Sequence, residues 1–287
     1  MTLTVSHLQV AYGGVVAVRD VSLSVQPGQI TAVLGANGAG KTTTLLGISG
    51  LVKARAGHVD FEGTSLLGLA PERVARLGIA HVPAGRGIFP GLSVADNLRM
   101  GLYGAGRDGD KEAVEEVLDA FPILRERRTQ PAGTMSGGQQ QQLAIGRALV
   151  QRPKLLMLDE MSMGLSPTVV VDLFALVRRL ADEGMAVVMV EQFVGQALKV
   201  ADQAVVIEQG TVAAAGRPED LSAEDIGAAY LGSDNGQELP RAPRDARQQV
   251  PVSLAGVDVR KLERIAAQQG RTADEVAQEL LEKALQP

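Results

Sequence analysis

The 287-residue sequence contains no cysteine and no tryptophan, and aromatic residues make up only 3% of it. Without cysteine, no disulfide can form and no thiolate can act as a nucleophile or metal ligand. A reducing compartment is compatible with this composition. The three histidines, His7, His58 and His81, lie far apart in the chain, so a histidine-based metal cage is not expected.

Long apolar stretches are also missing. No run approaches the roughly 18 apolar residues that a transmembrane helix requires, and the first residues lack the basic flank and apolar core of a secretory signal. The formal net charge is −5, which disfavours a dedicated nucleic-acid-binding protein because such proteins are usually basic. The composition, 45% hydrophobic and 21% charged, is typical of a globular protein with a substantial core.

The pattern of apolar residues predicts an α/β fold. Residues 1–25 are expected to form antiparallel strands with a hairpin turn at Gly13-Gly14. Short, nearly continuous apolar runs, which are typical of buried parallel strands, follow at 30–34, 155–158, 186–190 and 204–207. Helical patterns separate these runs, notably at 169–180. This alternation predicts a sheet covered by helices on both faces.

The rest of the chain differs in character. Residues from about 84 to 150 carry no strong strand signal and are predicted to form an inserted helical subdomain. Residues 233–249, rich in Asp, Pro, Arg and Gln, are predicted to be a linker. The predicted domains are therefore 1–232, with the helical insertion inside it, and a small unit at 250–287.

A glycine-rich stretch lies between the apolar run at 30–34 and a helical pattern. It fits G-x-x-x-x-G-K-[ST] at every fixed position. Glycines let the backbone N–H groups point at phosphate oxygens, and the following helix directs its positive end at the same anion. Lys41 is predicted to contact the β- and γ-phosphates, and Thr42 to bind Mg²⁺. The predicted nucleotide-binding residues of this loop are Gly35, Ala36, Asn37, Gly38, Ala39, Gly40, Lys41, Thr42 and Thr43.

This motif alone leaves kinases, GTPases and transport ATPases open. A second feature is the apolar run 155–158, which ends in Asp159-Glu160. In a fold with a phosphate loop, an aspartate at such a strand end holds Mg²⁺. The adjacent glutamate can activate water as a general base. We therefore predict Asp159 as a metal ligand and Glu160 as a catalytic residue.

The segment Met135-Ser136-Gly137-Gly138-Gln139 identifies a family. It resembles the L-S-G-G-Q signature of ATP-binding cassette (ABC) ATPases, with Met in place of Leu, and it lies before Asp159-Glu160 as in that family. The resemblance implies that Ser136, Gly137, Gly138 and Gln139 bind the γ-phosphate held by Lys41 of a second copy. It also implies the family's architecture, with an antiparallel β subdomain and an inserted helical subdomain. ATP-Mg would then lie between two cassettes.

Other roles are carried over by the same resemblance. Tyr12 matches the aromatic residue that stacks on adenine, although a packed residue beside a hairpin is the alternative. Gln192 stands where most cassettes have a histidine that senses the γ-phosphate. Ser162–Ser166 matches the loop that crosses to the partner subunit, without its usual aspartate. Ala84 stands in place of Gln or Glu, and Met161 in place of Pro. Because of Ala84 and Gln192, we expect good ATP binding but slow turnover.

One branch of the family is especially similar. Four segments resemble the smaller ATPase subunit of branched-chain amino-acid importers: 85–90, 121–122, 132–136 and 190–192. Urea and amide importers use a very similar subunit. This resemblance implies a peripheral protein at the cytoplasmic face of the inner membrane. Its expected partners are a second, identical or paralogous cassette, two permease subunits and an extracytoplasmic solute-binding protein.

The final segment, 250–287, has a strand–helix–helix pattern that resembles a ribbon-helix-helix module. Such a small unit usually needs pairing to become stable. The outward strand positions, Pro251 and Ser253, are not basic, so dimerisation is favoured over DNA binding. A helical hairpin packed on the main domain is the other alternative. An ATP-switched, DNA-associated regulator remains the alternative function, and a small-molecule kinase a weaker one that the signature segment opposes.

Overall fold

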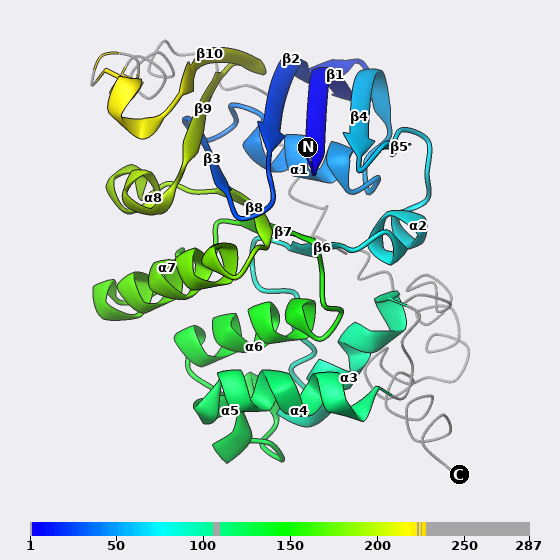
Figure 1. The fold of residues 1–287 in the computed structure, drawn as a ribbon, viewed down its shortest axis with the longest axis vertical. Coiled ribbons are helices and arrows are strands. Elements are labelled where there is room, and N and C mark those ends of the chain that lie inside the picture. The colour runs from blue at the N-terminus through cyan, green and yellow to red at the C-terminus, as the bar shows by residue number, and fades with distance from the viewer. Residues whose placement is uncertain (1, 106–109, 223, 225, 228–287) are drawn as a thin grey trace. The chain divides into compact units, whose positions relative to one another are not determined.

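The computed structural model describes residues 2–105, 110–222, 224, 226 and 227, which form two compact units. The first comprises the described residues of 2–85 and those from 153 onward, and the second comprises those of 86–152. The predicted linker at 233–249 and the predicted strand–helix–helix unit at 250–287 lie outside the described residues. Figure 1 shows the elements of both units.

The first unit begins with antiparallel strands. β1 (Leu3–Tyr12) pairs with β2 (Val15–Val25) and, on its other side, with β4 (Ala54–Phe61), which also pairs with the short β5 (Thr64–Ser65). Tyr12 lies opposite Val15 across the Gly13-Gly14 turn, as the sequence predicts. Alternate side chains of β1, for example Leu3 and Val5, are buried, because successive residues of a strand point to opposite faces.

The same unit contains a parallel region that carries the glycine-rich loop. Its strands are β3 (Ile30–Leu34), β6 (Ile79–Val82), β7 (Leu155–Asp159), β8 (Ala186–Val190) and β9 (Gln203–Glu208), flanked by β10 (Thr211–Gly216), which runs antiparallel to β9. The ten-stranded order is β5-β4-β1-β2-β10-β9-β3-β8-β7-β6. β3, β7 and β8 are buried at every position, as expected for parallel strands covered on both faces.

Helices cover both faces of the parallel strands (Figure 1). α1 (Lys41–Ile48) follows β3, and Leu45 of α1 belongs to one buried cluster with Leu155 and Met157 of β7. The intervening side chains of β7 point to the other face, where α7 (Pro167–Asp182) lies. α2 (Pro71–Arg76) precedes β6, and α8 (Val194–Val200) follows β8. The predicted α/β class is confirmed.

The second unit is helical over its described residues. It contains α3 (Val94–Ala105), α4 (Lys111–Ala120), α5 (Pro122–Glu126), a 3₁₀ turn (Ala132–Thr134) and α6 (Gly137–Leu149). α3 and α6 approach so closely at Gly101 that an added Cβ would lie 2.2 Å from the carbonyl oxygen of Arg147. The guanidinium group of Arg147 lies 5.5 Å from the centroid of the Phe89 ring, a distance typical of a cation–π contact.

Within the part of the chain that the structure describes, no helix combines the length and the apolar character needed to cross a membrane.

Candidate functional site

The glycine-rich loop joins β3 to α1. Gly35 has φ 144° and Gly40 has φ 107°, values that favour glycine. A Cβ at Gly35 would lie 2.1 Å from the carbonyl oxygen of Ile207, and a Cβ at Gly40 would lie 2.8 Å from that of Ala17. The loop therefore needs glycine at both positions for conformation and for space. We call residues 35–42 the phosphate loop.

The phosphate loop ends at a helix N-terminus suited to an anion. Gly40 is the N-cap of α1 and has no side chain to accept hydrogen bonds from the first turn, whose N–H groups lack intrahelical partners. The Lys41 ammonium folds over the loop and donates to the carbonyl oxygens of Gly35 (2.8 Å) and Ala36 (2.9 Å). Burial lowers the pKa of Lys41, while Glu160 and Asp159 act in the opposite direction. A bound phosphate would add further negative charge beside this ammonium.

Two oxygen-bearing side chains that were predicted to hold a divalent cation, Thr42 at the end of this loop and Asp159 at the end of β7, lie within hydrogen-bond distance of each other. The Thr42 hydroxyl donates to Asp159 Oδ1 over 3.0 Å, and the backbone N–H of Ala84 also donates to the Asp159 carboxylate. Burial raises the pKa of Asp159 to about 6, although the Thr42 hydrogen bond lowers it. A cation at this position would oppose that effect by favouring the charged carboxylate.

The composition of this oxygen pair points to a particular kind of metal. No group of three or more His, Cys, Asp or Glu side chains gathers into a metal site in the described part of the chain. A cation at Thr42 and Asp159 would therefore complete its shell with phosphate oxygens and water. That ligand set is the one magnesium prefers in nucleotide sites, so the residues present fit a small hard cation.

Glu160 and Gln192 meet because β8 lies between β3 and β7 in the sheet. Loops that follow parallel strands emerge at the same edge, so the segments after β3, β7 and β8 converge there. Gln192 Nε2 donates to Glu160 Oε1 and to Asn37 Oδ1, each over 3.0 Å. Glu160 has φ 47°, a left-handed conformation that is uncommon for a residue with a side chain. The structure thus brings together the predicted residues Asn37, Lys41, Thr42, Asp159, Glu160 and Gln192.

The predicted signature turn lies in the second unit, at the start of α6. Ser136 is the N-cap of this helix and accepts from the Gln139 N–H over 3.4 Å, while Gln139 Oε1 accepts from the Ser136 N–H over 3.1 Å. This reciprocal pair is a capping box, which holds the serine and the two glycines of the first turn in place. Arg86 Nη1 donates to Gln140 Oε1 over 2.7 Å and further restrains the turn. The role of the Ser136–Gln139 turn in binding phosphate stays a prediction.

Tyr12, predicted to stack on adenine, is an exposed residue. It is 42% exposed at the end of β1. Its ring is available for stacking, and adenine binding stays a prediction. The exposure of side chains varies along the predicted crossing loop 162–166. Met163 is exposed, whereas Ser162 is buried. Met161, which stands where the family usually has proline, is also buried and packs into the core.

Two residues whose pKa values are strongly shifted by burial, Glu191 and His81, were not predicted as site residues from the sequence. Glu191, beside Gln192, is 1% exposed, and burial raises its pKa to about 7. His81 on β6 has both ring nitrogens buried without a hydrogen-bond partner among the described residues, and burial lowers its pKa to about 4. The one sequence signal for Glu191 is its place immediately after a buried parallel strand, next to Gln192. No sequence signal marks His81.

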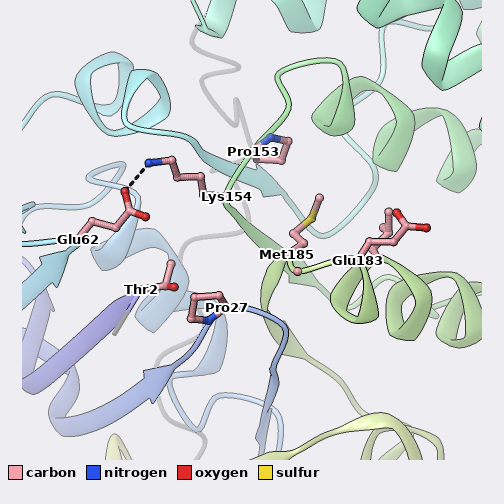
Figure 2. Close-up of a pocket in the computed structure, with 9 residues that line it drawn as sticks. Thr2, Pro27, Glu62, Pro153, Lys154, Glu183 and Met185 are labelled. Atoms are coloured by element: carbon pink, nitrogen blue, oxygen red, sulfur yellow. Dashed lines mark hydrogen bonds and ion pairs between the residues drawn. The ribbon is translucent and has the colours of Figure 1, made fainter.

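A pocket of about 380 Å³ in the first unit is not this site (Figure 2). It is lined by Pro27, Pro153, Lys154 and Met185, among others, and these residues precede β3, β7 and β8. The pocket therefore lies at the amino ends of the strands, whereas the phosphate loop and Gln192 follow their carboxyl ends. A Lys154–Glu62 ion pair of 2.6 Å borders it.

Comparisons with known proteins agree with this geometry. A family model described as ABC transporter matches residues 18–163. The high-affinity branched-chain amino acid transport ATP-binding protein BraG of Pseudomonas aeruginosa is 45% identical over 210 residues, covering 73% of this chain and 90% of BraG. The lipopolysaccharide export system ATP-binding protein LptB of Escherichia coli is 36% identical over 239 residues, covering 81% of this chain and 98% of LptB.

A solved structure of MJ1267, an ATP-binding cassette of an ABC transporter, is similar in fold. It is 28% identical, with a TM-score of 0.71, and the match covers 80% of this chain and 98% of that one. The span matched by the family model contains the phosphate loop, the capped Ser136 turn and the Asp159-Glu160 strand end. The chain therefore belongs to the ABC transporter family, as an ATP-binding and ATP-hydrolysing cassette.

Proposed function

We propose that the chain is the ATPase subunit of an importer that carries branched-chain amino acids or a related small solute. The observation that carries this proposal is the 45% identity to BraG across 90% of that protein, whose name specifies branched-chain amino acid transport. LptB, whose name specifies lipopolysaccharide export, is similar over nearly its whole length but is only 36% identical. The higher identity favours import over export.

The residues at the carboxyl edge of the sheet have separate roles in this proposal. Thr42 and Asp159 would hold Mg²⁺, which would supply positive charge to the phosphate oxygens. Lys41 adds a second positive charge at the β- and γ-phosphates. Glu160 accepts a proton from the attacking water, and Gln192 orients the Glu160 carboxylate through the hydrogen bond seen in the structure. Gln192 cannot itself carry a charge.

The capped turn at Ser136 completes the site from a second molecule. A serine hydroxyl and backbone N–H groups at a helix N-terminus favour an anion. In the proposed assembly, Ser136–Gln139 of one cassette contact the γ-phosphate bound to Lys41 of another, identical or paralogous cassette. ATP then holds two cassettes together, and hydrolysis releases them.

The membrane partners follow from the proposed import role. The cassettes drive two permease subunits from the cytoplasmic face of the inner membrane, and an extracytoplasmic solute-binding protein delivers the solute. The chain itself is peripheral in this arrangement. None of the residues at the nucleotide site would contact the transported solute.

Uptake in cells tests the substrate class. A strain lacking this chain should lose uptake of labelled leucine, isoleucine and valine, and expression of the full chain should restore it. The E160Q variant, which keeps the side-chain volume but removes the base, should not restore it. Glucose uptake serves as the control. Unchanged branched-chain amino-acid uptake together with lost urea or amide uptake would move the proposal to the neighbouring solute class, and loss of neither would overturn the import role.

Binding and assembly are tested with the same variant. Purified E160Q should form ATP-dependent dimers in magnesium that are detectable by size-exclusion chromatography with light scattering. A second change, S136R, should abolish these dimers, because a bulky cation replaces the capping serine. A monomer at saturating ATP in both proteins would contradict the shared site.

A further inference from the structure

A buried carboxylate joins the two loops that carry the catalytic pair. Glu191 is the first residue after β8 and is 1% exposed. It accepts from the Ser162 N–H over 3.2 Å and from the Ser162 hydroxyl through a short hydrogen bond. The backbone N–H of Gln192 also donates to the same carboxyl group. Neither Glu191 nor Ser162 has an assigned role in binding nucleotide, metal or water.

Two side-chain hydrogen bonds join the segment after β7 to the segment after β8. Ser162 lies two residues after Glu160, and Gln192 lies one residue after Glu191. The Gln192 amide donates to Glu160, and Glu191 accepts from Ser162. A backbone hydrogen bond of 2.9 Å from the Glu160 N–H to Val190 also joins the two strand ends. The distance between Glu160 and Gln192 is thus set by contacts on both sides.

We propose that Glu191 is a positioning residue, which fixes Glu160 against Gln192 by binding the loop after β7 to the loop after β8. This inference rests on the proposed role of Glu160 as the base. Glu160 has a left-handed backbone conformation, φ 47°, which costs free energy unless its surroundings hold it. The next residue is Met161 rather than a rigid proline. The hydrogen bonds from Ser162 to Glu191 restrain this turn instead.

Glu191 needs a carboxylate for this task. Burial raises its pKa to about 7, whereas the two hydrogen bonds from Ser162 and the one from Gln192 favour the charged form. A glutamine side chain has the same size but only one oxygen, and its NH₂ group would face a donor. E191Q therefore removes part of the restraint without creating a cavity.

The experiment compares steady-state ATP hydrolysis by purified full-length variants. E191Q should lower kcat on the order of 100-fold, as expected when a reacting group is misplaced by about 1 Å, while the KM for ATP stays unchanged. S162A, which removes one donor and keeps the carboxylate, should lower kcat by about tenfold. S162T restores the hydroxyl and should recover most of the activity. Adding S162A to E191Q should cause little further loss, since both act through one contact.

A matched control separates positioning from structure. Asp202 accepts from the Ile30 N–H over 2.8 Å and from Arg178 over 2.8 Å, away from the phosphate-loop ends of the strands. D202N should lower the midpoint of thermal unfolding but leave kcat and KM unchanged. If E191Q and S162A lower only the unfolding midpoint, as D202N does, Glu191 is structural and the inference is overturned.

The result also distinguishes this inference from the proposed catalytic role. E160Q should abolish hydrolysis while still retaining ATP. If E160Q hydrolyses ATP normally, the assignment of the base is wrong. If E160Q is inactive and both E191Q and S162A turn over at the wild-type rate, only the positioning role of Glu191 is wrong. If E191Q does not fold, S162A and its rescue by S162T decide the question.

Discussion

His81 should make the protein less stable as the pH falls below neutrality. It lies on β6, at the edge of the sheet, and pairs with Met157 of β7. His81 as a whole is partly exposed to solvent, but both of its ring nitrogens are buried and have no hydrogen-bond partner among the described residues. Burial lowers the pKa of His81 from 6.5 to about 4. Between these two values, the unfolded chain binds a proton that the folded protein does not.

The size of the effect follows from this difference in proton binding. Stability falls with falling pH wherever the unfolded state binds more protons. For pKa values of 6.5 and about 4, the contribution of His81 to the free energy of unfolding should fall by about 2 kcal/mol between pH 7.5 and pH 5. Burial of Glu191 and of Asp159 acts in the opposite direction, since their raised pKa values give stability that is present below their unfolded pKa values and is lost as the pH rises through about 6 to 7.

A variant isolates the contribution of His81 from that of Glu191. H81F removes the titration and the unsatisfied nitrogens while keeping an aromatic ring. Urea unfolding at pH 7.5, 6 and 5 should show H81F gaining about 2 kcal/mol relative to the wild type over this range. H58F, at an exposed histidine, is the matched control and should follow the wild-type curve. A constant difference between H81F and wild type at all three pH values would refute the reasoning.

Three further predictions concern substitutions that add a side chain or lengthen one. G101A should destabilise the helical unit by about 1–3 kcal/mol or more, because its Cβ would lie 2.2 Å from the Arg147 carbonyl oxygen. G195A, in α8 with open space around it, should instead stabilise by up to about 1 kcal/mol, and both are measured by thermal unfolding. A84Q should raise kcat for ATP hydrolysis by up to about tenfold, since it adds one hydrogen-bonding amide beside Asp159. An unchanged rate, with A84S as the short-chain control, would mean that Ala84 does not limit turnover.

Hydrophobic pattern alone identified much of the first unit. The buried parallel strands β3, β7, β8 and β9 are continuous apolar runs, and the Gly13-Gly14 hairpin has its turn residues in the expected place. β4 and β6 were not predicted. β4 contains Arg55 and His58 among its apolar residues, and β6 is only four residues long. Their strand conformation comes from pairing with β1 and β7, which local sequence does not reveal.

The candidate site divides in the same way. The phosphate loop and the Asp159-Glu160 pair are contiguous motifs whose chemistry depends on local spacing, so the sequence alone identified them. The contacts of Gln192 with Asn37 and of Glu191 with Ser162 join segments far apart in the chain. They exist because β8 lies between β3 and β7, and the sequence does not give this strand order. The pKa shift of His81 likewise depends on what packs around an edge strand.

This strand order has a consequence during synthesis. β3, which begins the phosphate loop, has β8 and β9 as its neighbours, and Ile30 pairs with Val187. A ribosome that has made only the first half of the chain has released Lys41 but not the strands that flank β3. The strand that precedes the phosphate loop therefore gains its two neighbours only after residues 186–208 have been made, and a product truncated before Gln192 lacks a complete site. Such fragments would expose an apolar strand, which makes them targets for chaperones or proteases rather than slow ATPases.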